Sequence, residues 1–230
     1  MAYSEALGIQ RSLAQSRIDH SLERDTLLLV EHPPVITLGR NFKETSLPTP
    51  REELRNRGIE VFSIDRGGDV TFHGPGQLVG YPIYDLTEHR RDLHWFLRQL
   101  ETALMRALSE LGVRSERNEG YTGVWTADRK IASIGIHVKH WVTWHGFALN
   151  VLTDLSYFEL MEPCGMADVV MTSVARELGA IAPRDIWGRA LDSVILGFSE
   201  TFGQRPQMTE LQTVLDSAAA ANSPARPSTP

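Results

Sequence analysis

The chain has 230 residues, of which 42% are hydrophobic and 23% charged, and its formal net charge is −6. This composition is typical of a soluble globular protein with one large domain or two small ones, and the acidic balance argues against a nucleic-acid partner. No apolar run reaches the roughly 18 residues of a membrane span, and residues 1–17 lack the apolar core of a signal peptide. Because Cys164 is the only cysteine, no intrachain disulfide can form, and the sequence favours a cytoplasmic protein with no membrane partner.

The first quarter of the chain alternates helical and strand patterns. Ala6, Ile9 and Leu13 are spaced three and four residues apart, which indicates a helix with one apolar stripe. Two apolar runs then flank the prolines at 33 and 34, which break the pattern. The expected elements are a helix over 4–17, strands over 25–30 and 35–38 joined by a proline corner, a loop over 41–50, a helix over 51–57 and a strand over 59–64.

The next stretch, residues 66–83, is the most informative in the chain and consists of RGGDVTFHGPGQLVGYPI. Its Gly-Gly and Gly-Pro-Gly turns separate two short strand patterns, at 70–72 and 78–81. Loops with so little side-chain bulk let backbone N–H groups come close to a ligand, although a simple glycine-rich hairpin explains the pattern equally well. Arg66, Asp69, His73 and Gln77 at the edges of the turns favour a binding site.

The second half of the chain contains the clearest helix, over residues 93–111, in which leucines recur on one face before Gly112 ends the pattern. Strands are expected over 121–125, 130–138 and 144–152, and a final amphipathic helix over 186–198. Residues 216–230 are rich in Ala, Ser and Pro, which predicts a mobile tail. The pattern as a whole predicts one α+β domain over residues 1–215, with strands connected mostly as hairpins.

Cys164 lies between a proline and a glycine, so a turn presents its sulfur instead of packing it in an apolar run. To act as a nucleophile it needs a neighbour that favours the thiolate. Histidine is the usual partner, and eight are present. Lys130 is the other candidate, because it opens a strand that is otherwise apolar. Two alternatives stay open: an inert cysteine, and a lysine that points into solvent.

His137, His140 and His145 raise the question of a zinc site, but 137 and 140 point to opposite faces of a strand. No metal is therefore expected. Gly146 and Ala148 leave room for an apolar ligand beside His145, or mark a strand with a small-residue bulge. The sequence contains neither a phosphate-binding loop of the Walker type nor a G-x-S-x-G motif.

Five segments taken together resemble the octanoyltransferases of lipoate biosynthesis. They are the stretch at 66–83, GVW at 123–125, KIASIGI at 130–136, HGFALNV at 145–151 and PCG at 163–165. The stretch EHPPVITLGRN at 31–41 is also similar. These segments follow the family's order and spacing over about residues 5–200. The resemblance implies the fold of the catalytic domains of biotin and lipoate protein ligases, a mixed β-sheet packed with helices.

The resemblance also implies an activity. An octanoyl group moves from octanoyl-acyl carrier protein to the ε-amine of a lysine on the lipoyl domains of 2-oxoacid dehydrogenases and on the glycine cleavage H protein. Cys164 would carry the acyl group as a thioester, and Lys130 would lower the cysteine's pKa and shuttle protons. The implied acyl-binding residues are Arg66, Gly67, Gly68, Asp69, Val70, Thr71, Phe72, His73, Ser133, Ile134, Gly135, Gly146, Phe147 and Ala148.

The chemistry of this activity agrees with the residues present. Passing an acyl group from a thioester to a thiol needs no ATP, and attack by an amine then gives a more stable amide, so no cofactor is expected. Backbone N–H groups near Gly67 and Gly68, or after Cys164, would stabilise the oxyanion. Val70, Phe72, Ile134 and Phe147 suit an apolar channel. Two alternatives remain: an ATP-dependent lipoate or biotin ligase, and an acyl-binding scaffold without catalysis.

Overall fold

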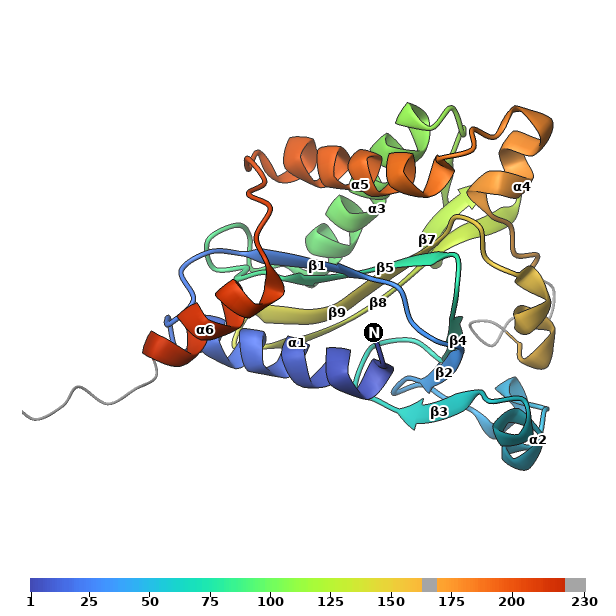
Figure 1. Cartoon of the computed structure of the whole chain (residues 1–230), viewed down its shortest axis with the longest axis horizontal. Helices are drawn as coiled ribbons and strands as arrows, with labels where there is room; N and C mark the ends of the chain where they lie inside the picture. The colour runs from blue at the N-terminus through green and yellow to red at the C-terminus, as the bar shows by residue number, and fades with distance from the viewer. Residues whose placement is uncertain (163–168, 222–230) are drawn as a thin grey trace, which may run out of the picture.

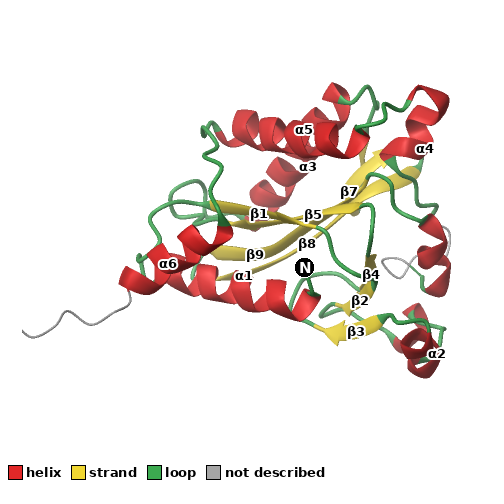
Figure 2. Ribbon diagram, viewed as in Figure 1, coloured by secondary structure: helices red, strands yellow, loops and turns green. Residues whose placement is uncertain are grey.

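The computed structural model describes residues 1–162 and 169–221, and the strands of this part form two sheets (Figures 1 and 2). The larger sheet has six strands, and every neighbouring pair in it is antiparallel. The smaller sheet has three, of which one pair is parallel and one antiparallel. The order in the larger sheet is β1 (Thr26–Val30), β5 (Gln77–Ile83), β9 (Val142–Asn150), β8 (Arg129–Lys139), β7 (Tyr121–Thr126) and β6 (Glu116–Asn118). The order in the smaller sheet is β3 (Glu60–Ser63), β2 (Val35–Leu38) and β4 (Val70–His73).

Helices cover both faces of the larger sheet (Figure 1). On one face lie α3 (Leu93–Glu110) and α5 (Ile186–Phe202), and on the other lie α1 (Tyr3–Ile18) and α6 (Leu211–Ala221). The smaller sheet is flanked by α2 (Arg51–Asn56), and α4 (Val174–Leu178) precedes α5. Short 3-10 helices occupy Glu44–Ser46, Leu155–Leu160 and Gly179–Ile181.

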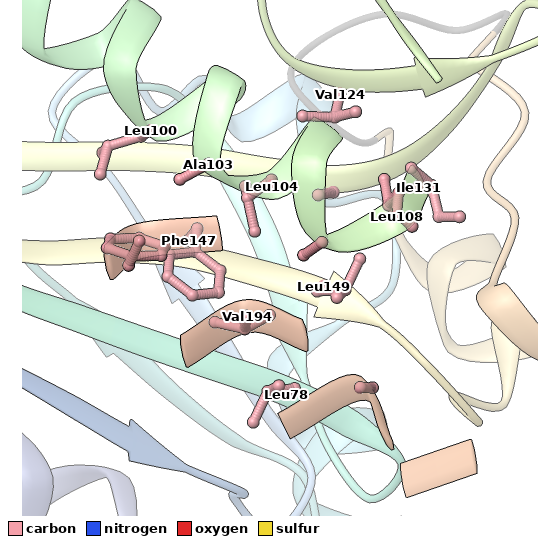
Figure 3. Close-up of a cluster of buried hydrophobic side chains, with 14 of the residues drawn as sticks. Leu78, Leu100, Ala103, Leu104, Leu108, Val124, Ile131, Phe147, Leu149 and Val194 are labelled. Carbon is pink, nitrogen blue, oxygen red and sulfur yellow. The ribbon is translucent and has the colours of Figure 1, made fainter. Parts of the chain in front are cut away.

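The main core lies between the larger sheet and the pair α3 and α5 (Figure 3). The Asp92 side chain accepts a hydrogen bond from the Trp95 backbone N–H and so caps the start of α3. From there Leu100, Leu104 and Leu108 recur on the face that covers the strands, and all are fully buried. Each such leucine contributes about 1.5–3 kcal/mol by leaving water, which makes this helix a rigid backing for β7, β8 and β9.

A second core lies between the smaller sheet and the 3-10 helix Leu155–Leu160. Phe72, on β4, is fully buried there. Its ring stacks on Tyr157 with 4.4 Å between centroids and meets the edge of Phe158 at 5.7 Å. Aromatic pairs of this geometry stabilise a fold beyond the area that they bury. The smaller sheet is therefore a packed unit that stands beside the larger one.

The structure confirms the predicted fold class and most of the predicted elements, but it corrects how the strands are connected. β1 pairs with β5, and β2 pairs with β3 and β4, so neither β1 with β2 nor β4 with β5 forms a hairpin. The proline corner at 33–34 and the Gly-Pro-Gly corner at 74–76 each carry the chain from one sheet to the other. The prediction of mostly hairpin connections is thus wrong at these two places, and it is correct for β7, β8 and β9.

Besides the 3-10 helices, three elements were not predicted: β6, α4 and α6. The last of these runs through residues 216–221, inside the predicted tail, and Ala218 is 3% exposed. Alanine has the highest helix propensity of all residues, so the Ala-rich run favours a helix once Val214 and Leu215 pack against the cluster that contains Leu13 and Trp144. Residues 222–230 lie outside the described part of the chain.

Candidate active site

Lys130, near the start of β8, is 2% exposed. The alternative of a lysine that points into solvent is therefore wrong. Its backbone N–H donates to the Val170 carbonyl at 2.8 Å, and its own carbonyl accepts from the Thr172 N–H at 2.9 Å. These bonds form a parallel bridge between Lys130 and Met171. The segment that begins at Val169 is thus fixed directly against the lysine.

The Lys130 side chain is confined by β7, the neighbouring strand. Its ammonium lies 5.5 Å from the centre of the Trp125 ring, a distance at which a cation is attracted by an aromatic face. Gly123, with φ +139°, lies against the end of the Lys130 aliphatic chain, because a Cβ atom at this position would be 2.8 Å from Lys130 Cε. The motif GVW at 123–125 is therefore the wall of the lysine's pocket.

The loop Arg66–Asp69 bridges the two sheets. The Arg66 guanidinium donates to the Thr37 carbonyl at 2.7 Å and to its hydroxyl at 3.0 Å, both on β2 of the smaller sheet. The Gly67 N–H donates to the Ile136 carbonyl on β8 of the larger sheet at 2.9 Å. Beneath this loop Gly135 leaves no room for a side chain, because a Cβ there would lie 2.7 Å from the Gly67 carbonyl oxygen.

Asp69 fixes a second loop next to the first. Its carboxylate accepts from the Ser46 hydroxyl at 2.6 Å and from the Lys43 backbone N–H at 3.3 Å. The Ser46 carbonyl in turn accepts from the Glu162 N–H at 2.9 Å. Asp69 is only 8% exposed, and both of its carboxylate oxygens accept hydrogen bonds. It therefore holds residues 43–46 against the loop Arg66–Asp69.

His73, at the end of β4, begins a buried chain of polar side chains. Its Nδ1 lies 2.8 Å from Gln77 Oε1, and Gln77 Nε2 donates to Asn150 Oδ1 at 2.9 Å. Asn150 Nδ2 then donates to the Thr172 carbonyl at 3.0 Å. Thr172 is the residue whose N–H pairs with Lys130. Three hydrogen bonds therefore connect the predicted acyl-binding histidine with the segment against the lysine.

Three residues that the sequence analysis did not single out complete the surroundings of His73. Tyr3 of α1 stacks parallel to the His73 ring at 6.0 Å between centroids. His32 lies 6.0 Å from the same ring and hydrogen-bonds through Nε2 to the Tyr81 hydroxyl at 2.8 Å. His32 stands in the motif EHPP, which was noted as a break between two strands and as part of the resemblance, but not for its histidine. For Tyr3 and Tyr81 the sequence carries no signal beyond their amphipathic type.

His145 belongs to a second cluster, around Asp65. Its Nε2 lies 2.9 Å from Asp65 Oδ1, and His137 Nδ1 lies 2.9 Å from the Asp65 carbonyl oxygen. Arg11 approaches the same carboxylate at 3.7 Å. Asp65 directly precedes Arg66, so this cluster holds the start of the glycine loop against β8 and β9.

Burial favours the neutral form of His73, His145 and His32. Burial lowers the pKa of His73 from 6.5 to about 3, with a smaller contribution from His32. Burial also lowers the pKa of His145 to about 4, because it outweighs the attraction of Asp65. The pKa of His32 is lowered for the same reason, and the pKa of the Tyr3 hydroxyl is raised by burial. At neutral pH this region therefore offers neutral hydrogen-bonding groups beside the Arg66 guanidinium.

The other predicted binding residues divide between the two faces of the sheet. Ala148 packs with Ala6, Val79 and Tyr81 on the α1 side. Phe147 points the other way into the main core, where its ring lies 5.3 Å from Phe198. Ser133 pairs with Ala148, Ile134 with Phe147 and Gly135 with Gly146.

The side chains predicted to form an apolar channel are thus found in packed cores. Val70 and Phe72 are buried in the second core and Phe147 in the main one, while Ile134 packs against the main core. Thr71 and His73 alternate with Val70 and Phe72 along β4 and point to the opposite face. Gly146 lies against the Gly80 backbone, which leaves no space for a larger residue. Ala148 is packed as well, whereas Ser133 and Gly135 are only partly buried and remain as the predicted acyl-binding surface on the α1 side.

Cys164 lies in residues 163–168, outside the described part of the chain. The residues on either side are described. Glu162 is held to Ser46 beside the loop Arg66–Asp69, and Val170 is held to Lys130. Within residues 1–162 and 169–221, no group of three or more His, Cys, Asp or Glu side chains could hold a metal ion. In the same ranges no helix is both long and apolar enough to cross a membrane.

The sequence matches the model of the lipoyl protein ligase A/B catalytic domain over residues 2–194. An octanoyltransferase of Koribacter versatilis is 50% identical over 182 residues, which cover 77% of this chain and 72% of that protein. An octanoyltransferase of Nostoc sp. is 44% identical over 203 residues, covering 88% and 89%. This chain belongs to the octanoyltransferase family. It is therefore an acyltransferase.

Solved structures agree on the fold. A bi-partite lipoate protein ligase from Thermoplasma acidophilum superposes with a TM-score of 0.65 at 17% identity, covering 92% of this chain and 88% of that one. Lipoate-protein ligase A bound with ATP superposes with a TM-score of 0.67 at 17% identity, covering 92% and 90%. The predicted likeness to ligase catalytic domains is thus confirmed for the fold.

Proposed function

We propose that this protein transfers an octanoyl group from octanoyl-acyl carrier protein to the ε-amine of a lysine on a lipoyl domain, through a thioester on Cys164. The acceptors would be the lipoyl domains of 2-oxoacid dehydrogenases and the glycine cleavage H protein. The observation that carries the proposal is the position of the two residues that flank 163–168. Glu162 is bonded to Ser46, beside the loop Arg66–Asp69, and Val170 is bonded to the buried Lys130.

In the first step the Cys164 thiolate attacks the carbonyl carbon of the donor thioester. A new C–S bond forms, the old one breaks, and the carrier protein leaves as a thiolate. The Lys130 ammonium would stabilise the Cys164 thiolate, as a nearby cation does for other reactive cysteines. A reducing cytoplasm, which the single cysteine favours, would keep this thiol available.

In the second step the amine of the acceptor lysine attacks the Cys164 thioester. A C–N bond forms, the C–S bond breaks, and Cys164 leaves as a thiolate. Lys130, having given its proton to the departing carrier thiolate, would take the proton that the attacking amine loses. The Gly67 N–H is already bonded to the Ile136 carbonyl, so the proposed donors to the oxyanion are the Gly68 backbone N–H or those in the segment after Cys164.

The octanoyl chain would lie against the small residues on the α1 side of β8 and β9, near Ser133, Gly135 and Ala148. The histidines next to this surface are neutral, as the lowered pKa values of His73 and His145 require. Neutral imidazoles at His73 and His145 suit an apolar chain, because neither ring carries a charge that would lose its water when the chain binds.

The test is the intact mass of the protein after mixing with octanoyl carrier protein and nothing else. We expect one octanoyl adduct, which peptide mapping should locate on Cys164, the one cysteine of the chain. The adduct should disappear when a lipoyl domain is added. A Cys164→Ala variant that still transfers at the normal rate would refute the thioester.

The same experiment separates the alternatives. The fold is shared with a lipoate-protein ligase that binds ATP, so an arm with free octanoate and ATP tests for ligase activity. Transfer in that arm, with no adduct from octanoyl carrier protein, would favour the ligase. Binding of the carrier protein without turnover in either arm would favour a scaffold.

A further inference from the structure

Glu101 is a fully buried carboxylate on α3 that has no part in the proposed chemistry. Its Oε2 accepts from Arg98 Nη1 at 2.7 Å and from Arg117 Nε at 2.9 Å. Its Oε1 accepts from the backbone N–H of Gly123 at 3.2 Å. A buried charge is costly, and one that is kept needs several donors, as this one has.

The residue that Glu101 holds is the wall of the Lys130 pocket. At Gly123 a Cβ atom would lie 2.8 Å from Lys130 Cε, 3.4 Å from Lys130 Nζ and 2.7 Å from the Ala132 carbonyl oxygen. The backbone of Gly123 is thus in contact range of the lysine side chain. Its φ of +139° is open to glycine and rarely to other residues.

β7 is also irregular at this place. Val124 pairs with Ala132 and Trp125 with Lys130, so the register shifts between the two. A bulge of this kind bends a strand and re-aims its side chains. The Glu101 carboxylate is bonded to Gly123, the residue directly before this bulge. Figure 3 shows Val124 next to α3, the helix that carries Glu101.

We propose that Glu101 is a positioning residue for Lys130: by fixing Gly123 and the β7 bulge, it sets where the lysine ammonium lies. Arg98 and Arg117 hold the carboxylate in place from the protein's surface. The functional part of this inference rests on the proposed role of Lys130. The geometric part does not, because it concerns only the contacts among Glu101, Gly123 and Lys130.

Glu101→Gln is the informative substitution. A carboxylate is an acceptor at both oxygens, whereas an amide accepts at one end and donates at the other. If the amide oxygen accepts from the arginines, the NH₂ group faces the Gly123 N–H, donor against donor. If the oxygen accepts from Gly123, the NH₂ group faces two guanidinium groups. In either orientation the side chain loses its hydrogen bond to Gly123 or its hydrogen bonds to the two arginines.

Asp25→Asn is a matched control. The Asp25 side chain is 1% exposed, like that of Glu101. It accepts from Arg17 at 3.3 Å, from the Asp85 backbone N–H at 2.9 Å, and lies 2.6 Å from His89 Nε2. Its partners are on α1, in the segment after β5 and, at Gln204, after α5, and none of those described is on β7. It therefore reproduces the general cost of losing a buried carboxylate.

The first measurement is the rate at which Lys130 is methylated by ¹³C-formaldehyde and borohydride. The chain has only three lysines, at 43, 130 and 139, so the methyl signals are few, and Lys130→Met assigns one. Lys43 and Lys139 are exposed and serve as internal references. In Glu101→Gln we expect the Lys130 rate to rise about tenfold relative to both references, because its wall opens locally. In Asp25→Asn the ratio should stay as in the native protein.

The second measurement is the pH dependence of alkylation of Cys164, the only thiol. Glu101→Gln should move the midpoint in the same direction as Lys130→Met, and the double variant should move it no further than Lys130→Met. Additive effects of the two substitutions would contradict action through the lysine.

The outcomes separate the positioning role of Glu101 from the proposed function of Lys130. An unchanged Lys130 methylation ratio in Glu101→Gln, with a loss of thermal stability like that of Asp25→Asn, overturns the positioning role. A changed ratio combined with an alkylation profile that Lys130→Met leaves unaltered supports the positioning role and refutes the proposed function of Lys130.

Discussion

Adding one methyl group at Gly135 tests how closely the loop Arg66–Asp69 packs on β8. A Cβ atom there would lie 2.7 Å from the Gly67 carbonyl oxygen and 3.2 Å from Arg66 Cδ. The first neighbour is backbone and cannot rotate away, so the loop must move off β8. Overpacking of this kind costs about 1–3 kcal/mol. For a domain of this size about 2 kcal/mol lowers Tm by about 4–8 °C.

Gly67→Ala is the control for Gly135→Ala. At Gly67 a Cβ would meet only the Ile136 carbonyl oxygen, at 3.5 Å, which is an ordinary contact. Both variants add one methyl group to the same contact between loop and strand, but only Gly135→Ala should lower Tm and weaken octanoyl transfer. Thermal unfolding followed by circular dichroism measures the first effect. Equal Tm values for the two variants would refute the close approach of loop and strand.

The remaining predictions concern the polar residues. Because the folded pKa values of His73 and His145 lie near 3 and 4 while the unfolded value is 6.5, the unfolded chain takes up protons first as pH falls below about 6.5, and stability decreases. Between pH 7 and 5 each histidine should remove about 2 kcal/mol, and urea unfolding with an unchanged midpoint would contradict this. Asn150→Asp replaces the donor to the Thr172 carbonyl and should cost about 1–3 kcal/mol, with faster hydrogen exchange at Thr172; unchanged exchange would count against the link. Asp69→Ala removes the acceptor of two hydrogen bonds and should make residues 43–47 more sensitive to proteases, whereas a native digestion pattern would argue against the anchor.

The sequence predicted the elements well where one physical signal dominated. The leucine spacing of α3 has one period, and the structure confirms the helix within a residue at each end. The Gly-Gly and Gly-Pro-Gly turns were also informative, since Gly68 and Gly76 have positive φ, as expected of such turns. Local chemistry determines these features, so a local pattern is enough to predict them.

The arrangement of the strands depends on which strands pair with one another, and a local sequence pattern does not contain this information. A run of apolar residues at 70–73 predicts a strand but not its partner. Val70 and Phe72 were expected in a ligand channel, and they lie in a core because β4 belongs to a second sheet, whose inner face they fill. The same reason applies to Phe147, which alternation places on the α3 and α5 side. Which side of its strand each of these side chains occupies depends on the tertiary fold, which a local pattern does not contain.

Contacts between distant residues were beyond prediction for a similar reason. Nothing in the sequence around Glu101 distinguishes it from other polar residues on a helix, and Asn150 was noted only as part of the segment 145–151. Their importance comes from partners far along the chain, such as Gly123 and Thr172. Lys130 was singled out because a lysine in an apolar strand is unusual, and its burial shows that this signal was informative.

The two groups of site residues are joined through one peptide segment. The Thr172 carbonyl ends the hydrogen-bonded chain from His73, and its N–H pairs with Lys130. A change at Asn150 should therefore be felt at Lys130, since both bond to the same residue. Leu104→Ala, in the main core, should lower stability without a specific effect at Thr172 or Lys130, because Leu104 has an apolar side chain that makes no hydrogen bond. Comparing hydrogen exchange at Thr172 in Asn150→Asp and Leu104→Ala, matched for loss of Tm, distinguishes a specific connection from general loosening.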